Sequence, residues 1–265
     1  MNIDAKLTAA LHDIEHVHSD KNIISTKDII SLIDLTHIDG NATAHDIDGL
    51  ATKAMKNQVA AICVLPKHLD YISPNINIKR ATVINFPTGN KPHLEVLKTI
   101  EQTIAFKTID EIDYVFPYQA YLAQNQRMAL SYCHEAYKLC KQHQLTFKVI
   151  IETGALPSNE IIYELSQEII NRGCDFLKTS TGKITHGATI PAVFAILAAI
   201  VDNNSTCGIK VSGGIKTIEQ ALSYMQLAHY MFQRKLDNTN FRLGASSLLD
   251  VIQAAMTIAI PGFVA

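Results

Sequence analysis

Two lysines follow consecutive apolar runs that are typical of buried β-strands. Lys178 lies in the segment 176–182 and Lys210 in the segment 208–214, and a glycine-bearing turn comes soon after each lysine. If the two runs are neighbouring parallel strands, which lie about 4.8 Å apart, the two amines are close together. Burial and a neighbouring like charge both disfavour the protonated form of an amine, and a neutral lysine amine attacks carbonyl carbons. The pair therefore indicates a nucleophilic lysine.

A solvated lysine that pairs with a carboxylate is the commoner explanation for any single lysine at a strand end. Two lysines at matching positions on consecutive strands make that explanation less attractive. Lys148 is a third candidate, but side-chain alternation places it on the same strand face as Glu152, so we expect it to be an ion-pair partner in a lower layer. Asp113 lies in an otherwise apolar strand, and opposite a lysine pair it is suited to relay protons.

Three turns late in the chain are rich in small and hydroxyl residues: 180–183, 212–214 and 244–247. Glycines allow backbone N–H groups to approach an anion, and the N-terminus of a following helix adds favourable dipole charge. Ordinary chain reversal explains any one of these turns, but their combination predicts a phosphate-binding cup. Asp34 and Cys63, which end the first two apolar runs, are further candidates for the same site.

Eight short apolar runs must position these side chains, and longer helical segments alternate with them. The predicted strands are 29–35, 60–65, 81–86, 112–116, 146–151, 176–179, 208–211 and 241–244. The predicted helices are 46–58, 67–72, 92–108, 119–143, 158–172, 190–203, 217–228 and 247–258. Most strand runs are continuous in Val, Ile and Leu rather than alternating, which is typical of parallel strands covered by helices on both faces.

Successive strands recur about every 30 residues, the size of one βαβ unit, so eight of them predict a (β/α)8 TIM-type barrel. The sequence shows no linker or shift in composition, and we therefore expect residues 1–265 to form a single α/β domain, with 1–25 as an extra N-terminal helical extension. Catalytic side chains of such barrels lie at the C-terminal ends of the strands. The alternative is an open doubly wound sheet, but the Gly-x-Gly-x-x-Gly turn common in that fold is absent from the sequence.

Composition narrows the range of functions further. The chain carries 23 Lys+Arg and 25 Asp+Glu, a formal net charge of -2, so nucleic acid and anionic membranes are not expected partners. The longest apolar stretch, 190–201, is shorter than the ~20 residues that span a bilayer. No positively charged cluster leads into an apolar segment at the N-terminus, so we expect a cytoplasmic protein. The five cysteines show no zinc-ligand spacing, and we expect buried thiols, no metal and no cofactor.

Eight segments, in order along the chain, resemble the 2-deoxyribose-5-phosphate aldolases, a family of class I, Schiff-base aldolases. The matching segments are 33–36, 60–64, 85–90, 112–117, 148–153, 176–182, 209–214 and 241–247. The lysine segment that continues into Thr179-Ser180-Thr181-Gly182 is highly specific. Together with the Gly-Gly and Ala-Ser-Ser turns, it leaves few rival families.

The resemblance implies an aldolase that reversibly cleaves 2-deoxy-D-ribose 5-phosphate to acetaldehyde and D-glyceraldehyde 3-phosphate without a metal. In that family the lysine matching Lys178 forms the Schiff base. The lysine matching Lys210 lowers the pKa of that first lysine and takes part in proton transfer together with the aspartate matching Asp113. The family residues around the substrate phosphate match Gly182, Gly213, Gly214, Ser246 and Ser247. The implied partners are a phosphosugar and small aldehydes, and family analogy allows a homodimer.

The chain departs from the family pattern at its C-terminus. Members related to the enterobacterial form end with a tyrosine that enters the site and assists proton transfer, whereas this chain ends with Pro261-Gly262-Phe263-Val264-Ala265. We therefore expect either another route for that proton or slower turnover.

Two alternatives stay open at this point. A barrel Schiff-base aldolase that acts on a different phosphorylated acceptor or donor would use the same nucleophile. A phosphosugar-binding barrel without catalysis, acting as a sensor, would require the paired lysines to be incidental.

Overall fold

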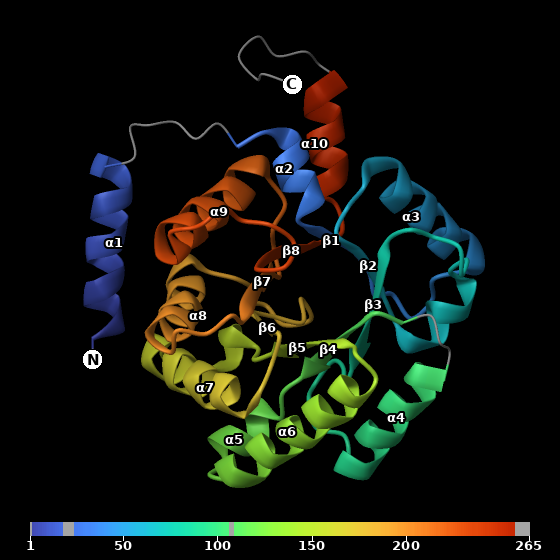
Figure 1. Ribbon diagram of the computed structural model, residues 1–265, viewed down its shortest axis with the longest axis horizontal. Coiled ribbons are helices and arrows are strands. Elements are labelled where there is room, and N and C mark those ends of the chain that lie inside the picture. Colours follow the sequence, from blue (N-terminus) through green and yellow to red (C-terminus); the bar gives the residue numbers. More distant parts are fainter. Residues whose placement is uncertain (1, 18–23, 106–108, 258–265) are drawn as a thin grey trace.

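Eight parallel strands close into a barrel in the order of the chain (Figure 1). Each strand pairs with the next one along the sequence, and β8 pairs with β1 to close the barrel. The computed structural model describes residues 2–17, 24–105 and 109–257. The strands are β1 Ile33–His37, β2 Ala61–Val64, β3 Lys79–Ile84, β4 Glu111–Val115, β5 Thr146–Ile150, β6 Phe176–Lys178, β7 Gly208–Ser212 and β8 Phe241–Ala245. The predicted TIM-type barrel is therefore confirmed.

Helices surround the barrel, and most of them form an outer ring (Figure 1). They are α1 Ile3–Val17, α2 Thr26–Ser31, α3 Ala44–Asn57, α4 His93–Ala105, α5 Tyr118–Leu122, α6 Gln126–Gln142, α7 Asn159–Arg172, α8 Ile190–Asp202, α9 Ile218–Phe232 and α10 Leu248–Thr257, with the 3₁₀ helices η1 Pro66–Tyr71 and η2 Thr153–Ala155. Helix α8 is buried along most of its length because it packs against α1, α7 and α9. Within the described ranges, the structure contains no helix with the length and apolar character needed to cross a membrane.

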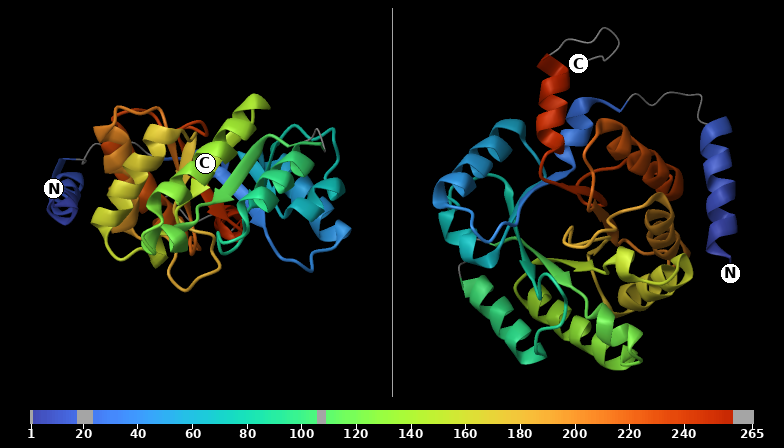
Figure 2. Two further views of the ribbon diagram at one scale, coloured as in Figure 1. Left: turned by 90° about the horizontal axis from the view of Figure 1, so that it is seen from below. Right: turned by 180° about the vertical axis from the view of Figure 1, so that it is seen from behind.

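The N-terminal helix α1 lies outside this ring and packs against α7, α8 and α9 (Figures 1 and 2). Its buried residues Ile3, Leu7 and Ala10 are spaced four and three positions apart, which places them on one helix face. The extra N-terminal helix is therefore confirmed. Residues 1 and 18–23 of the predicted extension lie outside the described ranges.

The structure corrects the predicted strand 29–35. Its first residues belong to α2, and β1 begins only at Ile33. The hydroxyl of Ser25 accepts a hydrogen bond from the Asp28 backbone N–H at 3.2 Å, and the Asp28 carboxylate accepts one from the Ser25 N–H at 2.9 Å. Short apolar runs suit buried helices and strands alike, so this capping box decides in favour of a helix.

The predicted helix 119–143 is two helices in the structure. Helix α5 ends at Leu122 and α6 begins at Gln126, because Gln124 between them has a left-handed φ of 64° that interrupts a right-handed helix. The predicted helix 67–72 is the 3₁₀ helix η1. The last residues of the predicted helices 92–108 and 247–258 lie outside the described ranges.

Candidate active site

Lys178 and Lys210 occupy directly paired positions on β6 and β7. Both side chains are buried, and both donate a hydrogen bond to the same oxygen, Asp113 Oδ2 on β4, at 2.7 Å each. The two lysines meet because paired positions on neighbouring strands present their side chains to the same face of the sheet. One carboxylate thus holds both amines in place.

Asp113 is the centre of a buried charge cluster. Its other oxygen, Oδ1, accepts a hydrogen bond from Lys148 Nζ at 3.0 Å, so three lysines share one carboxylate. Burial on its own raises the pKa of Asp113, but the charges of Lys148, Lys178 and Lys210 outweigh burial and hold that pKa well below its usual range. Asp113 is therefore ionised at neutral pH.

The two paired amines differ in their protonation. Burial lowers the pKa of Lys178; Asp113 opposes this effect, but the charge of Lys210 adds to it, and the pKa lies below its ordinary value. Burial also lowers the pKa of Lys210, but the charges of Asp113 and Asp34 outweigh burial and raise that pKa above its ordinary value. Asp34 Oδ2 lies 2.5 Å from Lys210 Nζ. Lys178 is thus the amine that loses its proton more readily, beside a second lysine that stays cationic.

A second layer of ion pairs lies nearer the N-terminal ends of the strands. Arg242 donates hydrogen bonds to Asp34 Oδ1 at 2.6 Å and to Glu111 Oε1 at 3.0 Å. Lys148 forms a close ion pair with Glu111 in addition to its contact with Asp113. The structure therefore places Lys148 as an ion-pair partner in a lower layer, as its strand position predicts.

The connected ion pairs join four basic side chains to three acidic ones. The members are Asp34, Glu111, Asp113, Lys148, Lys178, Lys210 and Arg242. The charges balance when one basic group is neutral, and Lys178 is the member whose pKa is lowered. Because an uncompensated buried charge is costly, the excess of one basic group favours the neutral amine that nucleophilic attack requires.

Glu111 and Arg242 also belong to this cluster, although neither is among the site residues predicted from the sequence. Glu111 precedes Asp113 by two residues on β4, so both side chains point to the same face. Arg242 lies inside β8, whose residues are all buried. A charged residue within a buried strand indicates a buried partner, and that signal is present in both segments.

The carboxylate of Glu152 supports the turn that follows β6. It accepts hydrogen bonds from Ser180 Oγ at 2.7 Å, from Thr181 Oγ1 at 2.5 Å and from the Thr181 backbone N–H at 3.2 Å. Ser180 Oγ in turn accepts a hydrogen bond from the Gly182 N–H at 3.0 Å. Gly182 itself is exposed and has a φ of 72°, which favours glycine at this position. A buried carboxylate therefore fixes the shape of an exposed turn.

The five predicted phosphate-binding residues all follow the C-terminal ends of β6, β7 and β8. They are Gly182, Gly213, Gly214, Ser246 and Ser247. Gly213 is half-buried and the other four are exposed. The two serines come directly before α10, so the free N–H groups of that helix start lie at the same end of the barrel.

Asp34 and Cys63 are both fully buried. Asp34 contacts Lys210 and Arg242 and belongs to the ion-pair cluster. Cys63 packs with Ala81 and Val83 in a small apolar group. Burial raises the pKa of the Cys63 thiol, so this side chain keeps its proton at neutral pH.

The turns after β6 and β7 touch each other through glycines. A Cβ atom on Gly187 would lie 2.1 Å from the carbonyl oxygen of Gly213. The N–H of Ala188 donates a hydrogen bond to that same oxygen at 3.0 Å, and Ser212 Oγ donates one to the carbonyl of Ser180 at 2.6 Å. The close approach leaves no room for a side chain at position 187.

The substitution Gly187→Ala is expected to lower the free energy of unfolding by about 1–3 kcal/mol, because the new methyl group forces the two turns apart. Urea unfolding measures this change. Gly49→Ala is the matched control: Gly49 lies in α3 with nothing within 4 Å of an added Cβ, so alanine there is expected to leave stability unchanged or to increase it. Equal stability of the Gly187 variant and the native protein would contradict the packing argument.

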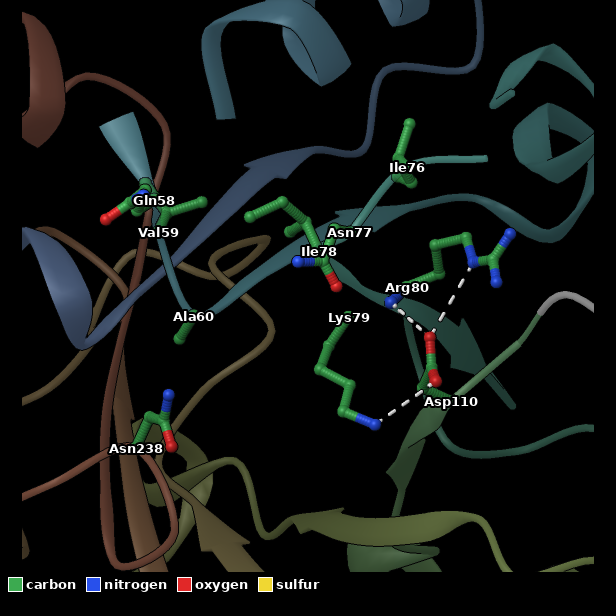
Figure 3. A pocket seen from close by; sticks show the side chains of 10 residues that line it. All are labelled: Gln58, Val59, Ala60, Ile76, Asn77, Ile78, Lys79, Arg80, Asp110 and Asn238. Carbon is green, nitrogen blue, oxygen red and sulfur yellow. Dashed lines mark hydrogen bonds and ion pairs between the residues drawn. The ribbon is translucent and has the colours of Figure 1, made fainter. Parts of the chain in front are cut away.

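A cavity of about 380 Å³ lies at the opposite end of the barrel (Figure 3). Its lining includes Ala60, Lys79 and Asp110, which lie at or just before the starts of β2, β3 and β4. Asp110 accepts a hydrogen bond from the Arg80 N–H at 2.9 Å and pairs with Lys79 at 3.3 Å. None of the candidate catalytic residues lines this cavity, so we do not assign it to the reaction.

A closed parallel barrel that gathers perturbed ionisable groups toward the C-terminal ends of its strands is the arrangement of a barrel enzyme. Comparison with known families defines the class: residues 29–254 match the profile of the DeoC/LacD family aldolases. The chain belongs to this family and is therefore an aldolase, a lyase of carbon–carbon bonds.

Solved structures share the fold over nearly the whole chain. A deoxyribose-phosphate aldolase from Aeropyrum pernix, described as having a unique tetrameric structure, is 23% identical, with a TM-score of 0.74 over 96% of this chain and 97% of its own. A Coccidioides immitis protein provisionally assigned as a deoxyribose-phosphate aldolase is 22% identical, with a TM-score of 0.77 over 97% of this chain and 98% of its own. An aldolase named QR15 is 23% identical, with a TM-score of 0.75 over 88% of this chain and 99% of its own.

Proposed function

We propose that this protein is a class I aldolase that reversibly cleaves 2-deoxy-D-ribose 5-phosphate to acetaldehyde and D-glyceraldehyde 3-phosphate through a Schiff base on Lys178. Membership of the aldolase family supports the reaction class. The observation that carries the mechanism is the buried Lys178 amine, whose pKa is lowered while Asp113 and the cationic Lys210 adjoin it. The residue types that the mechanism needs are thus in contact with one another.

In the direction of synthesis, the neutral Nζ of Lys178 adds to the carbonyl carbon of acetaldehyde, and loss of water leaves a protonated imine. The cation withdraws electrons from the neighbouring methyl group, whose proton leaves by way of water, Lys210 and Asp113. The enamine carbon then attacks the aldehyde carbon of glyceraldehyde 3-phosphate. Water hydrolyses the resulting imine, which releases deoxyribose 5-phosphate and restores the amine. Cleavage follows the same steps in reverse.

Asp113 has two tasks in this scheme. Imine formation turns a readily neutral amine into a fixed cation, and the ionised carboxylate 2.7 Å from Nζ is placed to stabilise that cation. The same oxygen accepts a hydrogen bond from Lys210, so a proton passes between the two lysine positions through a single atom. Because the pKa of Asp113 is far below its usual range, the carboxylate holds such a proton only transiently.

The phosphate group of the substrate is proposed to bind at Gly182, Gly213, Gly214, Ser246 and Ser247. Their backbone N–H groups and hydroxyls lie at the C-terminal end of the barrel, where the N-terminus of α10 adds favourable charge for an anion. Holding the phosphate fixes the distance of the aldehyde from Lys178. A bimolecular encounter thereby becomes a positioned reaction.

Reductive trapping tests the proposed Schiff base. The full-length protein is incubated with acetaldehyde and sodium borohydride, digested and mapped by mass spectrometry. We expect an ethyl group on Lys178 and none on Lys148 or Lys210, because neighbouring carboxylates raise the pKa of both of these lysines despite their burial. An adduct on another buried lysine, or no adduct at all, would contradict the proposal.

A chelator in the assay is expected to leave the activity unchanged, since no step uses a metal.

A second experiment separates the alternatives for the substrate. Initial rates of cleavage are compared for deoxyribose 5-phosphate and for hexose phosphates, because a fixed phosphate site favours the chain length that it positions. Faster cleavage of a hexose phosphate would indicate a different acceptor or donor at the same lysine. Phosphosugar binding with no cleavage of any sugar would favour a sensor.

Activity is expected to fall as the pH decreases. Only the neutral amine of Lys178 adds to a carbonyl group, and its lowered pKa gives it a larger neutral fraction at a given pH than an ordinary lysine has. Below that pKa, the rate is expected to fall about tenfold per pH unit. The dependence of kcat/KM on pH measures this limb, and a midpoint at about 10.4, the ordinary value for lysine, would contradict the proposed nucleophile.

The proposed partners are small molecules only: the phosphosugar and the two aldehydes that its cleavage produces. The proposed reaction uses no cofactor. We also predict a cytoplasmic location and a homodimer. Light scattering on the purified protein measures the oligomeric state.

A further inference from the structure

Two cysteines of neighbouring strand ends touch each other. Cys174 comes two residues before β6 and Cys207 one residue before β7, and their Sγ atoms are 3.4 Å apart. Both are free thiols in the structure. Cys207 is 3% exposed, whereas Cys174 is half-buried, so Cys174 is the more exposed residue of the two.

The surrounding backbone holds the two thiols in this position. The N–H of Gly208 donates a hydrogen bond to the carbonyl of Asp175 at 2.8 Å, and the N–H of Asp175 donates one to the carbonyl of Phe147 at 2.9 Å. The Asp175 side chain is tied to Lys141 at 2.9 Å. Formation of a disulfide requires the two Sγ atoms to approach from 3.4 Å to about 2.05 Å.

We propose that Cys174 and Cys207 are a modification site at which small-molecule disulfides, such as oxidised glutathione, convert the two thiols to an intramolecular disulfide. The thiolate of Cys174 attacks one sulfur of the reagent, forms a mixed disulfide and releases one molecule of the small thiol. The thiolate of Cys207 then attacks the Cys174 sulfur and releases the second. The two protons lost by the cysteines end on the two released thiols, and the reagent is the oxidant that is reduced.

The protonation of Cys174 sets the conditions for this reaction. The hydrogen-bonding contact with Cys207 and burial raise the pKa of Cys174 well above that of an ordinary thiol. Because the thiolate is the attacking species, oxidation is slow at neutral pH and becomes faster as the pH rises.

The disulfide joins positions that are 33 residues apart and that bracket β6, the turn at 180–183 and α8. Closing this loop restricts the unfolded chain, so the oxidised protein is more stable than the reduced one. The bond lies just before the strands β6 and β7, whereas Lys178 is the last residue of β6 and Lys210 the middle residue of β7. It therefore stabilises that part of the barrel without touching the proposed nucleophile.

The test uses the full-length, reduced protein incubated with oxidised glutathione at mildly alkaline pH. We expect the intact mass to fall by two hydrogens, a non-reducing peptide map to show a Cys174–Cys207 link, and Tm to rise by about 5–10 °C until a reductant reverses the change. A link between other cysteines, no link, or an unchanged Tm in the linked protein would overturn the proposal.

Two variants separate the roles of the thiols. Cys207→Ser is expected to stop at the mixed disulfide on Cys174, and Cys174→Ser to gain no glutathione at position 207. Cys133→Ala, which removes a buried thiol of α6, is the control that still forms the link. Labelling of Cys207 before Cys174 would contradict the order of attack, and the peptide map of the native chain decides the link itself even where a variant does not fold.

Discussion

Replacing Lys178 with arginine is expected to lower kcat for deoxyribose 5-phosphate cleavage by about 10⁴-fold or more, because a side chain that cannot lose its proton cannot form the Schiff base. Arginine keeps a long side chain with N–H donors beside Asp113, so loss of the hydrogen bond to that carboxylate does not explain the effect. Steady-state kinetics and borohydride trapping are measured on the same preparation, and we expect both the activity and the adduct to disappear.

Lys141→Arg is the matched control for this substitution. Lys141 pairs with Asp175 at the surface, away from the charge cluster, so the control is expected to keep native kinetics. A Lys178→Arg variant that retains more than about one tenth of the native kcat would rule out Lys178 as the nucleophile.

Replacing Asp113 with asparagine is expected to affect both stability and rate. The substitution removes the carboxylate shared by three buried lysines, and the contact with Asp113 is the ion pair that holds Lys178. Losing one partner of a buried ion pair costs about 3–5 kcal/mol of unfolding free energy, and losing a proton-transfer group costs about 10²–10⁴ in kcat. Urea unfolding and steady-state kinetics measure these two effects.

The same variant has a pH signature that a general loss of structure would not produce. Asp113 raises the pKa of Lys178, so without its charge that pKa falls further, and the acid limb of the residual activity moves to lower pH. A limb that stays in place or moves to higher pH would contradict the assigned electrostatics. Asp202→Asn is the control: Asp202 pairs with Lys6 at the surface, and its loss is expected to cost at most about 1 kcal/mol.

The barrel and the pairing of Lys178 with Lys210 could be predicted from the sequence. Continuous apolar runs at regular intervals indicate parallel strands, and matching positions on consecutive strands of a barrel necessarily become neighbours. The run 29–35 shows the limit of this reasoning. Its apolar residues suit a helix or a strand equally, and the boundary at Ile33 depends on the capping box at Ser25 and Asp28.

The charge cluster could not be predicted from the sequence, because its members come together only when the barrel closes. Arg242 reaches Glu111 across the interior, although 131 residues separate them, and Asp34 meets Lys210 only because β8 pairs with β1 and brings the two ends of the sheet together. No local pattern encodes such distances. The sequence could predict that Lys178 is crowded by a second lysine, but only the three-dimensional arrangement shows that four bases share three acids.

The sequence by itself determined the repeating strands and helices, the face of the sheet to which each side chain points, and the residue types available for imine chemistry, because these follow from local periodicity along the chain. The tertiary structure alone decided which buried charges compensate one another, and therefore which lysine has a lowered pKa and which a raised one. It also decided that Cys174 and Cys207 touch. The physical reason is that pKa values and side-chain contacts depend on distance and burial in space, which barrel closure sets and separation along the chain does not.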